Sequence, residues 1–130
     1  MTYGDFLSSV RASGDYPDEE AATAVDAVVR TLGERLPQPS SQHLADQLPQ
    51  PVAGLLEDAA DVSAEGRPWG VEEFIRQVAL HTGEDRDTAE TDTRNVFSAI
   101  SERVSGGEMN KLLSQLPSGY AELFGYSELA

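Results

Sequence analysis

The two histidines are the side chains best suited to proton transfer near neutral pH, yet neither stands in a recognisable catalytic pattern. A hydrolytic triad needs a nucleophile, a base and an orienting group within mutual reach. His43 falls early in a predicted short helix and His81 near the end of a longer one. The chain has no cysteine, which excludes a thiolate nucleophile or thiolate metal ligands. We interpret both histidines as surface residues.

An acidic run surrounds the predicted start of a long helix in the second half. Asp85, Asp87, Glu90 and Asp92 do not match a calcium-binding loop, which requires ligands at alternating positions and a central glycine. Negative charges at a helix start stabilise the positive end of the helix dipole. This interpretation is favoured over weak binding of a divalent cation, so we expect no metal and no cofactor.

Six polar residues recur at equivalent positions in the two halves of the chain. A Glu-Arg pair ends each long predicted helix, and a glutamine precedes a Leu-Pro corner in each half; the six are Glu34, Arg35, Gln47, Glu102, Arg103 and Gln115. We expect them to make polar contacts between the halves, either as purely structural contacts or as the lining of a polar groove. Trp69 is the only tryptophan, and we expect it to cover the core or, if exposed, to contact a partner.

These positions recur because the chain contains an internal repeat. LADQLPQPVAGLL at 44–56 and LLSQLPSGYAELF at 112–124 share Gln-Leu-Pro and Ala-x-Leu at an offset of 68 residues. The same offset, without a gap, superimposes 3–62 on 71–130 and aligns many apolar positions that have helical spacing. The sequence therefore predicts two copies of one helical unit.

In each repeat the apolar spacing predicts about four helices and no strand. In the first repeat they are expected at 3–13, 18–36, 41–48 and about 50–60. Gly33 lowers the stability of the second of these unless close packing requires it. Ser40 or Ser41 is the expected cap of the third, and Pro49 ends it.

The second repeat follows the same scheme. A helix stops near Gly83, and a long one follows with Asp85 or Asp87 as its cap. Gly106-Gly107 is expected to break that long helix before two short apolar segments. Residues 61–69 read as the linker between the repeats. We thus predict an all-α, compact bundle of about eight helices, built from two pseudo-symmetric four-helix repeats that form a single domain over 1–130.

The ordered pattern resembles a known family. Phe6-Leu7-x-x-Val10, Leu32-x-Glu-Arg-Leu36, the two Gln-Leu-Pro corners and the closing Leu123-Phe124 are similar to the prokaryotic domain of unknown function 2267 family. The resemblance covers nearly the whole chain. It implies a compact helical domain and carries no established activity or catalytic residues.

Charge is the strongest compositional feature. The 23 acidic residues outnumber nine basic ones, for a net charge of −14. Such a charge repels nucleic acid and anionic membrane surfaces, so we expect neither as a partner. The N-terminus lacks a basic start and an apolar core, and no apolar run approaches a membrane span, which indicates a soluble cytoplasmic protein.

These observations favour a non-enzymatic helical interaction or structural module, either a monomer or a homodimer, with a protein partner that the sequence does not identify. One alternative is a bundle that binds a small molecule in a pocket between the repeats. Another is an acidic regulator that binds a basic protein. An enzyme acting through carboxylates has no positive support in the sequence.

Overall fold

The computed structural model describes residues 2–14, 16–62 and 65–126, and within these ranges all regular structure is helical. The described residues form eight helices: α1 Tyr3–Gly14, α2 Asp18–Arg35, α3 Gln38–Ala45, α4 Val52–Val62, α5 Val71–Thr82, α6 Arg86–Ser101, α7 Gly106–Ser114 and α8 Tyr120–Leu123. The predicted all-α class and helix number are confirmed. None of the described helices is long and apolar enough to cross a membrane.

The helix starts follow the offset of the sequence repeat. Tyr3 and Val71 begin the first helix of each half, and the starts of α2 and α6, α3 and α7, and α4 and α8 are likewise 68 residues apart. The fourth helices differ, because α4 has 11 residues and α8 has four. Consequently α4 packs against both α2 and α3, whereas the short α8 makes only a small contact with α6.

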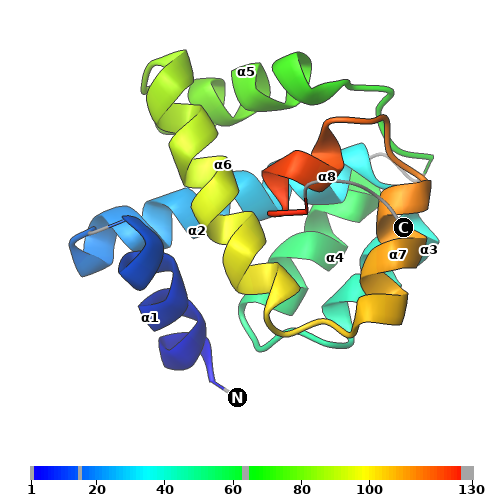
Figure 1. Cartoon of the computed structure of the whole chain (residues 1–130), viewed down its shortest axis with the longest axis horizontal. Coiled ribbons are helices and arrows are strands. Elements are labelled where there is room, and N and C mark those ends of the chain that lie inside the picture. Colours follow the sequence, from blue (N-terminus) through cyan, green and yellow to red (C-terminus); the bar gives the residue numbers. More distant parts are fainter. Residues whose placement is uncertain (1, 15, 63–64, 127–130) are drawn as a thin grey trace.

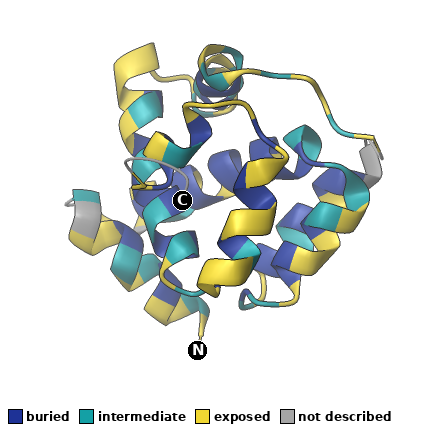
Figure 2. Cartoon of the chain, turned by 45° about the vertical axis from the view of Figure 1, so that its right-hand side comes forward, coloured by how far each residue is buried: buried dark blue, intermediate teal, exposed yellow. Residues whose placement is uncertain are grey.

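The halves interlock through their first two helices. The first helix of each half, α1 or α5, contacts the long helix of the other half as well as that of its own. Figure 1 shows α6 crossing in front of α2, with α5 along the top of the view and α1 at the lower left. The predicted apolar stripes meet in one core, and Figure 2 shows the buried faces of the helices turned inward.

Close packing explains the glycine within α2. A Cβ built on Gly33 would lie 2.7 Å from the Cβ of Ala59 and 2.8 Å from the carbonyl oxygen of Leu56. Gly33 therefore lets α4 approach α2 where any side chain would collide. The two corner leucines, Leu48 and Leu116, are each 8% exposed, so both Gln-Leu-Pro corners face the core.

Several predicted boundaries were wrong. α3 ends at Ala45, and not at residue 48. α3 begins at Gln38 with Pro37 as its cap, and not after Ser40 or Ser41, because Pro39 fits the first turn of a helix, where no backbone N–H is needed. α6 ends at Ser101, so Gly106-Gly107 does not break it.

These glycines instead open α7, where the hydroxyl of Ser105 accepts a hydrogen bond from the Glu108 N–H at 3.2 Å and caps the helix. The predicted linker 61–69 also overlaps the end of α4. α4 continues to Val62, residues 63–64 lie outside the described residues, and non-helical backbone runs from 65 to 70.

Candidate functional site

The two repeated arginines fasten the ends of the long helices to other parts of the chain. The Nε of Arg35 donates to the Trp69 carbonyl oxygen at 2.7 Å. Arg103 reaches α1, where its Nη2 donates to the Asp5 carbonyl oxygen at 3.0 Å and to the Ser9 hydroxyl at 2.7 Å. Each guanidinium also lies over an aromatic ring, Arg35 over Tyr120 at 5.6 Å and Arg103 over Phe6 at 5.5 Å.

The two repeated glutamates lie beside these arginines but do not meet each other. Glu34 lies 3.9 Å from His81, an exposed residue at the end of α5. The two side chains form an ion pair only when the histidine is protonated. Glu102 lies 3.2 Å from Arg103. A single polar groove holding all six repeated residues is therefore absent from the described part of the chain.

The two repeated glutamines do share a groove, which lies between α3 and α7. The Gln115 Oε1 accepts a hydrogen bond from the Ser40 hydroxyl at 2.6 Å, and the Gln47 Oε1 accepts one from the Ser105 N–H at 3.5 Å. The groove is lined largely by counterpart pairs of the two repeats: Ser40 and Glu108, His43 and Lys111, Leu44 and Leu112, Gln47 and Gln115, with Val104 between them. Its cavity volume is about 90 Å³, well below the roughly 300 Å³ at which small-molecule sites begin.

Trp69 belongs to the segment that joins the halves. Its carbonyl oxygen accepts hydrogen bonds from Arg35 and from the hydroxyl of Tyr120, the latter at 2.8 Å, and the residue as a whole is half-buried. The two donors come from different halves, so the backbone at Trp69 serves as a shared anchor. Tyr120 packs edge-on against Phe74, which joins this anchor to the core.

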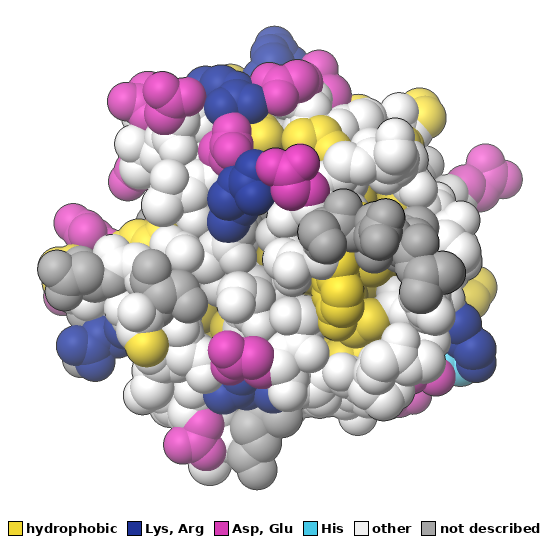
Figure 3. Space-filling model, in the orientation of Figure 1, with side chains coloured by type: hydrophobic (Ala, Val, Ile, Leu, Met, Phe, Trp, Pro, Cys, Tyr) yellow, Lys and Arg dark blue, Asp and Glu magenta, His cyan; other side chains and the backbone are white. Residues whose placement is uncertain are grey.

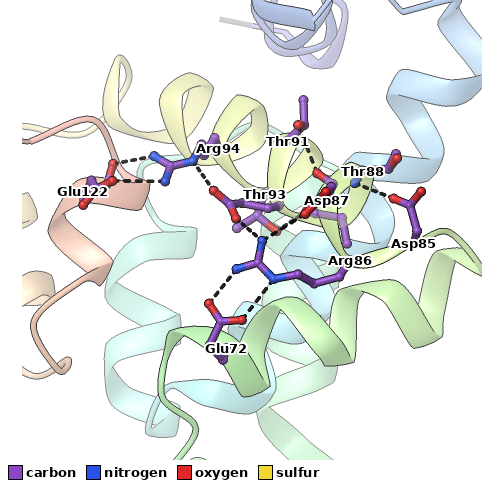
Figure 4. A network of polar contacts seen from close by, with 11 residues as sticks. Glu72, Asp85, Arg86, Asp87, Thr88, Thr91, Thr93, Arg94 and Glu122 are labelled. Atoms are coloured by element: carbon purple, nitrogen blue, oxygen red, sulfur yellow. Dashed lines mark hydrogen bonds and ion pairs between the residues drawn. The ribbon is translucent and has the colours of Figure 1, made fainter.

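The acidic run around the start of α6 divides into two groups that face different ways. Asp85 is the cap, since its side chain accepts a hydrogen bond from the Thr88 N–H at 2.8 Å, and this bond lowers the pKa of the carboxyl. Asp85, not Asp87, therefore fills the capping role. Figure 4 shows the row of ion pairs beyond this cap, which is centred on Arg86 and which we call the charged ladder.

Arg86 is the centre of that ladder. Its guanidinium makes a bidentate contact with Glu72 of α5, at 3.0 and 2.6 Å, and also bonds Glu90 one turn along α6. Arg94 then bridges Glu90, at 2.9 Å, to Glu122 of α8, at 3.2 Å. Figure 3 shows acidic and basic side chains interleaved over the region of α5 and α6. Exposed pairs of this kind contribute little singly, and the ladder mainly ties α5 and α8 to α6.

Asp92 points away from the ladder and is only 4% exposed. Its Oδ1 accepts a hydrogen bond from the Tyr16 hydroxyl at 2.5 Å, and that hydroxyl accepts one from the Asn95 Nδ2 at 2.9 Å. Burial raises the pKa of the Asp92 carboxyl, and the charge of Glu20 raises it further, while the bond from Tyr16 acts in the opposite direction. Sequence reasoning missed Tyr16 and Asn95. The spacing of Asp92 from the buried residues Ala89 and Val96 was the available signal that it faces inward.

Asp92 lies at the floor of an acidic cleft between the two halves. The lining residues are Tyr16, Glu19, Glu20, Thr23 and Ala24 of the first half and Thr82, Glu84, Thr88 and Asp92 of the second, around a volume of about 320 Å³. We call this the acidic cleft. It contains four carboxylates, and neither lysine nor arginine is among the lining residues.

The carboxylates of the acidic cleft repel one another. Burial raises the pKa of Glu84, as do the charges of Asp92, Glu20 and Asp85. The pKa of the Tyr16 hydroxyl is also raised, by burial and then by its bond to Asp92. Among the described residues no three His, Asp or Glu side chains are grouped closely enough to hold one metal ion. The arrangement is thus an open concentration of negative charge without a chelating geometry.

The comparison with family models agrees with the resemblance found in the sequence. A family model described as "Uncharacterized conserved protein (DUF2267)" matches residues 3–123. A search of curated proteins found no match.

Proposed function

We propose that this chain, which belongs to the uncharacterized conserved DUF2267 family, is a non-enzymatic interaction module that binds a basic segment of a partner protein in the acidic cleft. The observation that carries the proposal is the set of four carboxylates, Glu19, Glu20, Glu84 and Asp92, around a concave surface whose lining has no lysine or arginine. The net charge of −14 would attract such a partner over a longer range.

The raised pKa of Glu84 indicates that its negative charge lacks compensation. A guanidinium or ammonium group placed in the acidic cleft would relieve this repulsion and would form charge-assisted hydrogen bonds with the carboxylates. The charged ladder on the other face of α6 offers no such gain, because Arg86 and Arg94 already neutralise its glutamates.

The spread of the carboxylates favours several separated positive charges over one metal ion. A calcium or magnesium site needs its oxygen ligands within about 2.6 Å of one point. The described residues contain no grouping of three such ligands. Arginine or lysine side chains on an extended segment could instead reach Glu19 and Glu20 on α2 and Glu84 on the facing loop.

The volume of the acidic cleft favours a second candidate, a small organic polycation. About 320 Å³ falls at the lower end of the range for small-molecule sites, and the cleft lies between the two halves. A linear polyamine would satisfy the same carboxylates. The protein partner is preferred because a cleft open to solvent leaves much of a small flexible ligand exposed, which limits its affinity.

Titration calorimetry with a short lysine- and arginine-containing peptide tests the proposal, with spermine and a glycine- and serine-containing peptide as comparisons. We expect the basic peptide to bind and the affinity to fall as salt is added. Binding of spermine without binding of the peptide would favour the second candidate. Equal heats for the basic and the neutral peptide would refute both.

A matched pair of triple variants locates the site. Glu19→Gln, Glu20→Gln and Glu84→Gln together should abolish most of the binding. Glu57→Gln, Asp58→Asn and Glu65→Gln remove the same charge from exposed positions outside the acidic cleft and should weaken binding only slightly. Equal losses in the two variants would show that net charge alone, and not the acidic cleft, attracts the peptide.

A further inference from the structure

Tyr16 connects the corner between α1 and α2 to the floor of the acidic cleft. Its hydroxyl donates to Asp92 at 2.5 Å and accepts from Asn95 at 2.9 Å, so both of its hydrogen-bonding roles are filled by α6. The donor and the acceptor of the first bond are 76 residues apart in the chain. Tyr16, Asp92 and Asn95 therefore link the two halves at a part-buried point.

The surrounding structure holds Tyr16 in this position. A Cβ built on Gly14 would lie 2.3 Å from the Tyr16 ring and 2.4 Å from the Asn95 Nδ2, so the close approach depends on glycine at this site. The Nε of Arg11 donates to the Tyr16 carbonyl oxygen at 3.1 Å and fixes the backbone. The ring is thus confined between α1 and α6 with its hydroxyl directed at Asp92.

Asp92 faces mainly negative groups. From α2 it experiences the charge of Glu20, and it shares the acidic cleft with Glu19 of the same helix. The loop before α6 contributes Glu84, with Asp85 close behind it. The neutral Tyr16 hydroxyl approaches Asp92 from the corner between α1 and α2, and the Arg11 cation binds the Tyr16 carbonyl oxygen. Thr88 and Asn95 are the neighbours contributed by α6 itself.

Resting on the proposed function, we infer that Tyr16 is a positioning residue that keeps Asp92 ionised at the floor of the acidic cleft, and that proton uptake by Asp92 releases a basic partner. The Tyr16 hydroxyl is the only hydrogen-bond donor to Asp92 recorded among the described side chains, while burial and Glu20 both oppose the charged form. A bound cation and a bound proton therefore compete for the same carboxylate.

The direction of the effect follows from the roles of the two groups. A hydrogen bond donated to the charged form of an acid lowers its pKa. Without the Tyr16 hydroxyl, the pKa of Asp92, already raised by burial, would rise further. Asp92 would then lose its charge at a higher pH, and binding of the cationic peptide would fail at that higher pH.

The experiment measures binding of the same basic peptide across a pH series with the wild type, Tyr16→Phe and Tyr126→Phe. Tyr126 is a partly exposed tyrosine outside the acidic cleft, so its variant controls for loss of a phenolic hydroxyl. We expect Tyr16→Phe to move the acid midpoint of binding upward by about one to two pH units, the size expected when a charged acceptor loses one hydrogen bond. Tyr126→Phe should leave the midpoint unchanged. Equal midpoints for Tyr16→Phe and the wild type would overturn the inference.

A second readout does not depend on any partner. Carboxyl carbon resonances followed by NMR report the titration of Asp92 directly, and the Asp92 midpoint should rise in Tyr16→Phe by the same amount. If the wild type fails to bind the peptide at any pH, the proposed function fails; if the Asp92 midpoint also stays fixed, the positioning role fails independently.

Asp92→Asn covers the case in which Tyr16→Phe does not fold. The asparagine oxygen can still accept the bond from Tyr16, so the connection between α6 and the corner is retained, but the group no longer titrates. The peptide should bind this variant more weakly than the wild type at neutral pH, and the acid step assigned to Asp92 should disappear. An unchanged acid step would assign the pH dependence to another carboxylate and overturn the inference.

Discussion

Gly33 of α2 and Ala59 of α4 approach so closely that a Cβ on Gly33 would lie 2.7 Å from the Cβ of Ala59. Glycine normally weakens a helix, and here it permits the close contact between α2 and α4. In α6 the equivalent position is Ser101, and the position equivalent to Ala59 lies outside the described residues.

Replacing Gly33 with alanine should destabilise the protein even though alanine favours helix. The propensity gain is about 1 kcal/mol, and overpacking typically costs about 1–3 kcal/mol. Because the atoms close to this Cβ include the backbone of Leu56, which yields less than a flexible side chain, we expect a net loss in the free energy of unfolding measured with urea. Gly107→Ala, where a Cβ would meet open space, should be neutral or stabilising. A more stable Gly33→Ala would mean that α4 can move away at little cost.

The two corner leucines should contribute similarly to the core. Leu48→Ala and Leu116→Ala each remove a buried side chain and leave a cavity, which costs about 2–5 kcal/mol. Leu80→Ala is the control, because that side chain is 65% exposed and should change stability by less than about 0.5 kcal/mol. A loss below that control value at either corner would show that the corner does not support the core.

Added salt should raise the melting temperature. The net charge of −14 repels itself at low ionic strength, and at about 0.15 M salt the screening length falls to roughly 8 Å. Screening also weakens the ladder of Arg86 and Arg94, but exposed pairs of that kind contribute little. Calorimetric scans from low to molar sodium chloride measure the balance, and a flat or falling melting temperature would contradict the expectation.

Ionisation of Glu84 in the acidic cleft should make the protein less stable. The pKa of Glu84 is raised in the folded state, so the folded protein holds this proton more tightly than the unfolded chain does. The destabilisation is fully present above the folded pKa and is relieved as pH falls through it. Glu84→Gln should therefore melt at a higher temperature than the wild type at neutral pH, and the two curves should converge in acid. Glu57→Gln, which removes the same charge from an exposed position on α4 outside the acidic cleft, is the control.

Local patterns in the sequence predicted most of the helices. The stripe Phe6–Val10 in α1, the stop at Gly83 after α5 and the corner at Pro49 each depend on a few neighbouring residues, so a short window contains the necessary information. The internal repeat further indicated which helices of the two halves correspond to each other. The start of α3 was misplaced because Pro39 can either break a helix or occupy its first turn, and the local sequence alone did not distinguish the two.

The candidate site required the tertiary structure. Asp92 was visible only as one member of an acidic run, and nothing near it in the chain indicated Tyr16, 76 residues away. Likewise the repeat singled out six polar residues, but the packing of the halves decided that the glutamines share a groove and the glutamates do not. The sequence by itself determined the helices and their apolar faces, because these depend on residue type and spacing within a few turns. The tertiary structure decided which carboxylates share a cleft, because that depends on how helices distant in the chain pack against one another.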